Sequence, residues 1–256
     1  MSTSGTHVVH DTTVLLKRSL RHILRSPDTI ITTAITPIAM MLLFVYVFGS
    51  AIQVGGGSYV NYLLPGILLI TVASGIAYTA FRLFTDVSGG IFERFQSMPI
   101  ARSAVLWSHV LTSLVANLVS LGLVVLVALA MGFRSGAGIL AWLAVVGILT
   151  LFTLALTWLA LIPGLTAKSV DGVSGFSYPL IFLPFISSAF VLTAGMPGPV
   201  RWFAEHQPVT PIVNTIRNLY AQQPVGNDGW IAVGWCVALL VVAYALAMST
   251  YRRKIA

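Results

Sequence analysis

The sequence predicts an all-α integral membrane protein with six transmembrane helices, an N-terminal amphipathic interfacial helix and an external re-entrant helical segment before the last span. The first reason is composition: 57% of the 256 residues are hydrophobic and 8% are charged, whereas soluble domains carry about 25% charged residues. The second is placement, because the charges fall between apolar runs that reach the roughly 20 residues needed to cross a bilayer. One transmembrane domain over residues 1–256, in contact with membrane lipids, is therefore expected.

Six apolar stretches predict the individual spans. No charge occurs between Asp28 and Arg82, and the polar, glycine-rich residues 53–58 divide that run into two crossings. The later runs are bounded by charged residues, and each suits one crossing with some tilt. The expected spans are residues 30–48, 62–81, 104–131, 138–162, 176–195 and 230–250.

Lysine and arginine fall mainly on one side of these spans. With the N-terminus inside, the inner segments hold eleven of the fourteen basic residues, and the outer segments hold only Arg134, Arg201 and Arg217. Cytoplasmic loops of membrane proteins are enriched in Lys and Arg, so both termini are expected in the cytoplasm. The charges form no single patch, which argues against a nucleic-acid partner. The excess of Arg over Lys is typical of GC-rich bacterial genomes, and we expect a multi-pass protein of the bacterial plasma (inner) membrane.

Residues 12–25 are expected to form a helix that lies in the membrane interface. Leu16, Leu20, Ile23 and Leu24 share one helical face, as interfacial helices require. Each basic residue near anionic headgroups contributes about 1 kcal/mol of binding. The alternative is a basic flank that only fixes the topology. The basic residues of the opposite face are Lys17, Arg18, Arg21 and Arg25.

Residues 196–228 are expected to stay on the external side. Pro208 and Pro211 interrupt the segment, and the periodic apolar residues between the breaks predict two helices too short to cross. Trp202 and Phe203 suit the headgroup level of the membrane. The segment is therefore interpreted as a helical cap, re-entrant or surface-lying, that precedes the last span.

Most chemistry of known sites is missing from the sequence. No phosphate-binding loop of the form Gly-x-x-x-x-Gly-Lys-Ser/Thr occurs, so the chain is not expected to hydrolyse nucleotides. The five histidines are scattered and predict no metal site. A carrier driven by an ion gradient is another possible function. All seven acidic residues fall in flanks or loops of the predicted topology, which argues against such a carrier.

One short motif leaves an enzymatic alternative. Gly172-Val173-Ser174-Gly175 matches the motif of intramembrane serine proteases. A serine nucleophile needs a histidine base within hydrogen-bond reach. The only later histidine, His206, is expected at the opposite side of the membrane. An intramembrane serine protease-like enzyme built on Ser174 is kept as the alternative function.

The cytoplasmic loop 86–100 has the features of a rigid contact. Gly89-Gly90 should end the helix that leaves the second span, and residues 91–96 can form a short helix that stops before Pro99. Glu93 and Arg94 would be exposed on it. Such a helix can transmit motion between the spans and a soluble partner. An ordinary interfacial turn is the alternative.

Three segments together carry a family resemblance: Leu64-Pro65-Gly66, the run Glu-Arg-Phe-Gln-Ser-Met-Pro-Ile-Ala-Arg at 93–102, and Phe-Ala-Glu-His-Gln-Pro-Val-Thr-Pro at 203–211. They resemble the permeases of type-2 ATP-binding cassette exporters, most closely the daunorubicin-resistance type, over almost the whole chain. The resemblance implies a homodimeric permease that works with two copies of a separate ABC ATPase subunit. ATP and Mg would be bound by that partner, and this chain would need no cofactor of its own.

The resemblance also implies the substrate class and the coupling residues. Exported molecules would be hydrophobic or amphipathic, such as a drug or a lipid. The residues at the family's ATPase-coupling positions are Glu93, Arg94, Phe95, Ser97, Met98 and Pro99. Hydroxyl and aromatic residues of the first three spans could line the substrate's path, although such residues also hold spans together. These candidate wall residues are Thr32, Thr36, Tyr46, Thr71, Ser74, Tyr78 and Ser113.

Overall fold

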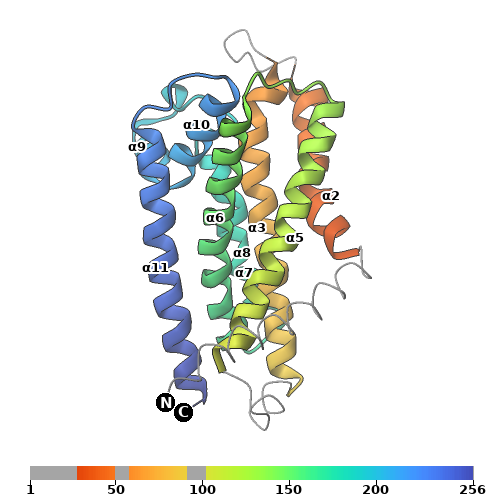
Figure 1. Ribbon diagram of the computed structural model, residues 1–256, viewed down its shortest axis with the longest axis vertical. Coiled ribbons are helices and arrows are strands. Elements are labelled where there is room, and N and C mark those ends of the chain that lie inside the picture. Colours follow the sequence, from red (N-terminus) through yellow and green to blue (C-terminus); the bar gives the residue numbers. More distant parts are fainter. Residues whose placement is uncertain (1–27, 50–57, 91–101, 256) are drawn as a thin grey trace.

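The computed structural model describes residues 28–49, 58–90 and 102–255, and the helices of these residues form one elongated bundle (Figure 1). No strand occurs among the described residues. The N-terminal residues Lys17, Arg18, Arg21 and Arg25 and the loop residues 91–101 lie outside them. The elements are α2 (Asp28–Leu43), η1 (Phe44–Phe48), α3 (Tyr59–Ser88), α5 (Arg102–Ala130), α6 (Ile139–Thr166), α7 (Val170–Gly175), α8 (Ser177–Phe182), η2 (Leu183–Ile186), η3 (Thr193–Gly195), α9 (Gly198–His206), α10 (Val209–Tyr220) and α11 (Asp228–Ile255).

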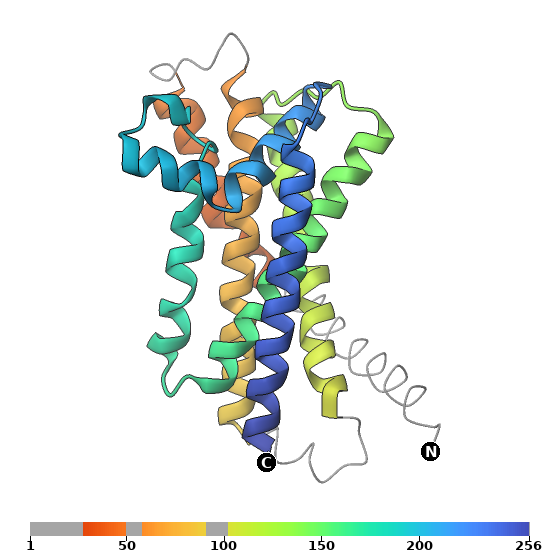
Figure 2. The same ribbon diagram turned by 90° about the vertical axis from the view of Figure 1, so that its left-hand side faces the viewer.

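Four described helices are long and apolar enough to cross a membrane: α3, α5, α6 and α11. They run along the length of the bundle; α3, α6 and α11 run away from the end that holds α9 and α10, and α5 runs toward it (Figure 1). The short helices α9 and α10 lie across one end, which we call the cap end (Figure 2). Ser88 of α3 and the last residues of α11 lie at the opposite end. Gly89 caps α3, and Gly90 has a positive φ of 69° that favours glycine.

The first and fifth predicted spans take shorter or interrupted forms. α2 continues into the π-helical turn η1, and the apolar helix over Thr33–Phe48 ends at the cap end. The fifth region is divided into α7, α8 and η2, and residues 187–192 that follow are not helical. Pro179 and Pro184 lack the N–H that a continuous helix needs, and proline rings clash with the preceding turn. In Figure 2 this region rises beside α3 toward the cap end.

α3 is the central helix of the fold. In its most apolar stretch, 83% of the residues are buried, compared with 33% for α5 and α6 and 22% for α11. It packs against α2, α5, α6, α8 and α10. Gly164 of α6 lies so close to α3 that an added Cβ would be 3.0 Å from the Ala80 carbonyl oxygen. Small residues allow such close approach where lipid supplies no hydrophobic drive. The outward faces of α5, α6 and α11 are apolar and exposed, as lipid contact requires.

Candidate functional site

A polar stripe runs along one face of α5 in the half of the bundle away from the cap. Its residues are spaced three or four apart, so they lie on the same side of the helix. The stripe faces Gly75, Tyr78, Thr79 and Arg82, which follow the same spacing on α3. The stripe residues that line this cavity are His109, Thr112, Ser113, Asn117 and Ser120.

Hydroxyl and amide groups connect three helices here. The hydroxyls of Thr79 on α3 and Ser113 on α5 are 2.6 Å apart, and Ser113 Oγ lies 3.5 Å from Thr157 Oγ1 on α6. Asn117 Nδ2 donates to the Ser113 carbonyl oxygen at 2.9 Å. In an apolar surrounding, hydrogen bonds between helices hold the spans in register. Thr79 and Thr157 also donate to their own helices, which anchors the network.

Gly75 makes room for the Asn117 amide. A Cβ added at Gly75 would overlap all three terminal atoms of the Asn117 side chain. The two helices therefore approach closely only because position 75 has no side chain. The cavity that remains between α2, α3 and α5 has a volume of about 20 Å³, which is room for one water-sized group.

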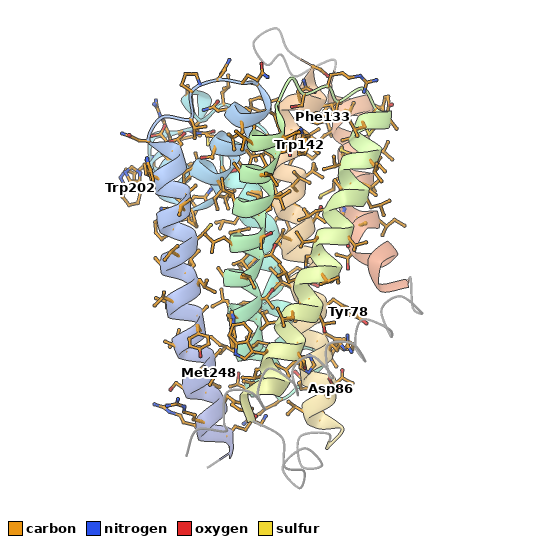
Figure 3. The ribbon with its side chains drawn as sticks, in the orientation of Figure 1. Tyr78, Asp86, Phe133, Trp142, Trp202 and Met248 are labelled. Carbon is orange, nitrogen blue, oxygen red and sulfur yellow. The ribbon has the colours of Figure 1, made fainter. Side chains whose placement is uncertain are left out.

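Ionisable groups lie at the end of the cavity nearer Ser88. His109 Nε2 on α5 is 3.3 Å from Asp86 Oδ2 on α3. Arg82, one helical turn before Asp86, lines the cavity, and among the described residues no carboxylate lies within 4 Å of its guanidinium. Figure 3 shows Tyr78 and Asp86 in this half of the bundle. The region is polar inside, holds an arginine and a carboxylate at one end, and is enclosed by apolar helix faces.

Of the candidate wall residues whose side chains the structure describes, Tyr78 and Ser113 line this cavity. Thr71 is fully buried in α3, and its hydroxyl donates to the Ile67 carbonyl oxygen at 2.8 Å. Ser74 is half-buried and does not line the cavity, whereas Thr36 and Tyr46 are exposed. Thr32 lies in α2, but its side chain is outside the described part.

A second polar assembly joins the cap to the bundle through Arg217 of α10. Its guanidinium donates to the carbonyl oxygens of Tyr62 at 3.1 Å and Ser188 at 2.8 Å, and to Asn214 Oδ1 at 3.3 Å. It also lies 3.8 Å from the centre of the Tyr62 ring, a cation–π contact. Burial lowers the pKa of Arg217 below its ordinary value, yet an arginine remains charged at neutral pH. We call this assembly the Arg217 clasp.

The clasp satisfies backbone groups left free by the break after η2. Ser188 belongs to the non-helical residues that follow η2, so its carbonyl oxygen has no helical partner. The Tyr62 hydroxyl donates to the same oxygen at 3.0 Å, and Ser188 Oγ donates to Asn214 Oδ1 at 2.7 Å. Asn214 Nδ2 in turn donates to Asp228 Oδ2 at 3.1 Å, at the start of α11. The break, the cap and the last long helix are therefore linked.

Residues of two resemblance motifs support the same break. Gln207 Nε2 donates to the Ile186 carbonyl oxygen at 3.2 Å, and the Ser188 N–H donates to Thr210 Oγ1 at 3.3 Å. A Cβ at Gly66 of α3 would lie 2.7 Å from the Ala189 Cβ, so this glycine admits the non-helical segment. These motif residues therefore have a structural role in holding the cap.

The outer face of α9 combines aromatic and charged groups. Trp202 is 64% exposed and points away from the bundle (Figure 3). Its ring stacks on His206 at 4.7 Å between centroids. Arg201 Nε donates to Glu205 Oε1 at 2.7 Å, and this hydrogen bond holds the pKa of the Glu205 carboxyl below its ordinary value. An exposed tryptophan beside charged groups is typical of a membrane–water interface.

The structure offers no support for serine hydrolase chemistry at Ser174. Ser174 lies on α7, which follows α6 at the end opposite the cap, whereas His206 lies on α9 in the cap (Figure 2). His206 Nδ1 hydrogen-bonds the Trp202 carbonyl oxygen at 2.7 Å. Within the described residues no group of three or more His, Cys, Asp or Glu side chains could hold a metal ion. Cys236 is buried and unpaired.

Several of these residues are not among the sequence-predicted candidates. The stripe of α5 was detectable, because polar residues at 109, 112, 113, 117 and 120 repeat at helical spacing inside an apolar run. The role of Arg217 was not, since its partners are carbonyl oxygens of distant segments. Glu93, Arg94, Phe95, Ser97, Met98 and Pro99 lie outside the described residues, so their contacts stay a prediction.

Comparison with known proteins places this architecture in one family. Residues 10–220 match the ABC-2 type transporter family. The chain is 30% identical over 236 residues to the daunorubicin resistance ABC transporter permease protein DrrB1 of Streptomyces coeruleorubidus, a match that covers 89% of this chain and 81% of that protein. It is 24% identical over 246 residues to the probable doxorubicin resistance ABC transporter permease protein DrrC of Mycobacterium tuberculosis, covering 96% and 89%. Because the match spans most of the chain, this multi-pass membrane protein belongs to the ABC-2 type transporter family of permeases.

Proposed function

We propose that this chain is the transmembrane subunit of an exporter that moves a hydrophobic or amphipathic molecule, a drug or a lipid, out across the bacterial plasma membrane. The observation that carries the proposal is the match over 89% of the chain to a daunorubicin resistance permease. The bundle adds physical support, because apolar outer faces enclose a polar cavity between α2, α3 and α5. Such a cavity can bind the polar part of a molecule whose apolar part stays in lipid.

Energy for export would come from a separate ABC ATPase. The chain is a transport subunit and not an enzyme in this proposal, because its sequence has no phosphate-binding loop. Two ATPase copies would bind ATP and Mg and act on a homodimer of this chain. Residues Glu93–Pro99 would form the contact through which ATP-driven closure reaches the spans. The basic residues 17–25 would hold the N-terminal segment at anionic headgroups.

Six crossings with both termini in the cytoplasm account best for the helices. α3, α5, α6 and α11 would each cross once, the chain through α2 and η1 would make the first crossing, and α7 through η2 the fifth. The external cap would hold α9 and α10. With this orientation the α11 end carries Arg252, Arg253 and Lys254 inside, in agreement with the enrichment of basic residues in cytoplasmic segments.

Topology can be tested with single cysteines in a Cys236→Ala background. A cysteine at Gly56 should react with a membrane-impermeant maleimide added outside intact cells, and a cysteine at Ser97 should react only after the membrane is permeabilised. The reason is that the two positions flank the crossing made by α3. Labelling of Ser97 alone from outside would invert the orientation and place the coupling loop away from ATP.

Replacing Ser174 separates transport from proteolysis. Ser174→Ala should leave substrate export within about twofold of wild type, since it removes one hydroxyl from a half-buried side chain of α7 and creates none of the defects that destabilise proteins strongly. Export measured as cellular accumulation of doxorubicin checks this. Loss of all activity in Ser174→Ala, with normal protein level in the membrane, would make the enzymatic alternative the better account.

The proposed function itself is tested by partner capture and drug tolerance. Affinity-tagged permease isolated in mild detergent should bring down one ATPase subunit that carries a phosphate-binding loop. Expression of both subunits together in a susceptible bacterium should raise tolerance to doxorubicin, and neither subunit alone should do so. Full tolerance from the permease alone would contradict an ATPase-driven mechanism.

A further inference from the structure

We propose that the cavity between α2, α3 and α5 is a recognition subsite for one neutral hydroxyl group of the transported molecule. This inference rests on the proposed function and names a chemical feature of its substrate. The subsite consists of the Thr112 hydroxyl and the Asn117 side-chain oxygen, and Tyr78 and Arg82 line the same cavity. The apolar remainder of the substrate would lie against the adjoining helix faces.

Two buried oxygens without partners point to a ligand. Thr112 Oγ1 and Asn117 Oδ1 have no hydrogen-bond partner and lie in residues only 4% and 1% exposed. Buried polar atoms in folded proteins are nearly always hydrogen-bonded, because an unpaired one loses its hydrogen bonds to water and gains none in the protein. The residues Thr112 and Asn117 both line the same cavity. A donor placed between α2, α3 and α5 would reach groups that the fold itself leaves unsatisfied.

The size of the cavity limits what can enter. About 20 Å³ admits one water-sized group, so a hydroxyl fits and a ring or a phosphate does not. A hydroxyl can donate one hydrogen bond and accept two, so it can donate to Asn117 Oδ1 while it accepts from the Thr112 hydroxyl. When no substrate is present, a water molecule can take the same place. Tyr78, 39% exposed, lies between this cavity and the surface of the bundle.

The surrounding charges favour a neutral group over an ammonium group. Among the described residues, Arg82 lines the cavity without a carboxylate within 4 Å of its guanidinium, and Asp86, whose carboxylate lies 3.3 Å from His109, is not one of the lining residues. An ammonium group beside an arginine in a region of low dielectric would be repelled. The subsite therefore distinguishes molecules by a hydroxyl and not by a positive charge.

The test uses two probes that differ by one hydroxyl. Doxorubicin carries one hydroxyl more than daunorubicin, and both are fluorescent. Binding of each to purified full-length permease in lipid nanodiscs would be measured by fluorescence for wild type, Thr112→Val and Asn117→Leu. Thr153→Val is the matched control, because Thr153 is a buried threonine of α6 outside the cavity whose hydroxyl donates to Leu149 at 2.7 Å.

The expected result is a preference for doxorubicin in wild type and in Thr153→Val that Thr112→Val and Asn117→Leu reduce by about fivefold, the scale of one neutral hydrogen bond. Thr112→Val should melt at or above the wild-type temperature, since it removes an unpartnered hydroxyl, so weaker binding would not reflect misfolding. Equal binding of both drugs by wild type, or binding of neither, would overturn the subsite. Full preference for doxorubicin in both variants would do the same, and the cavity would then be a site for a water molecule only.

The proposed function can fail separately from the subsite. ATP-driven transport with the partner ATPase is measured independently of binding by the isolated permease. A preference for doxorubicin that depends on Thr112 and Asn117, without ATP-driven export, would support the subsite and contradict the exporter function. ATP-driven export with the preference unchanged in both variants would support the exporter function and contradict the subsite.

Discussion

Arg217→Leu should lower the free energy of unfolding by about 3 kcal/mol, because each hydrogen bond to a charged group contributes about 1.5–3 kcal/mol and the leucine leaves carbonyl oxygens of Tyr62 and Ser188 without that donor. The cap and the break after η2 would lose their common contact. Thermal unfolding of the purified protein, followed by tryptophan fluorescence, measures the effect.

Two further substitutions make the comparison specific. Arg217→Lys should recover only part of the stability, because an ammonium group cannot spread its donors over the Tyr62 and Ser188 carbonyl oxygens as a guanidinium does. Arg201→Leu is the matched control, since Arg201 lies on the exposed face of α9 and pairs with Glu205 one turn away; exposed pairs of this kind contribute about 0.5 kcal/mol. Equal melting temperatures for Arg217→Leu and Arg201→Leu would contradict the clasp.

Glu93→Arg and Arg94→Glu should nearly abolish export while the permease reaches the membrane at normal level. Both residues are expected to be exposed on the cytoplasmic loop, where substitutions change stability by about 0.5 kcal/mol or less. Across a subunit contact, however, like charges brought together cost roughly several kcal/mol. A cost of this size is enough to prevent docking of the ATPase. Substrate stimulation of ATP hydrolysis by the partner should be lost together with transport.

The matched control for the loop is an equally charged change elsewhere on the cytoplasmic side. Arg253→Glu, in the last turn of α11, should leave export largely intact, because it lies outside the resemblance motif. Full export by the Glu93→Arg/Arg94→Glu double variant, at wild-type protein level, would mean that residues 93–99 form an ordinary turn.

The long helices were predictable from the sequence because the length and apolar composition of a segment determine whether it can cross a membrane. The apolar runs correspond to α3, α5, α6 and α11, and Gly89-Gly90 marks the end of α3. Interruptions inside an apolar run were harder to predict. Residues 176–195 are as apolar as a membrane span. Because Pro179 and Pro184 cannot donate helical hydrogen bonds, this region forms α8 and η2 and then leaves the helical conformation. The chain tolerates the break because Arg217, Gln207 and other cap residues bond its free backbone groups.

The candidate site was only partly predictable for a related reason. Tyr78 and Ser113 were identifiable as polar side chains within predicted spans, yet the same rule selected Thr71, whose hydroxyl bonds its own helix. The cavity depends on which faces of α3 and α5 meet, and Gly75 opposite Asn117 decides that contact. Counting charges placed Arg217 outside the spans, but it could not identify carbonyl partners more than 25 residues away in sequence.

The measurement that tests the central claim most directly is transport by the purified permease with its ATPase subunit in sealed proteoliposomes. Doxorubicin should move across the membrane when ATP and Mg reach the ATPase, and movement should continue after a protonophore collapses the proton gradient. An ATPase with its phosphate-loop lysine replaced should support no movement. Movement that needs the proton gradient and proceeds without the ATPase subunit would contradict the account and identify a gradient-driven carrier instead.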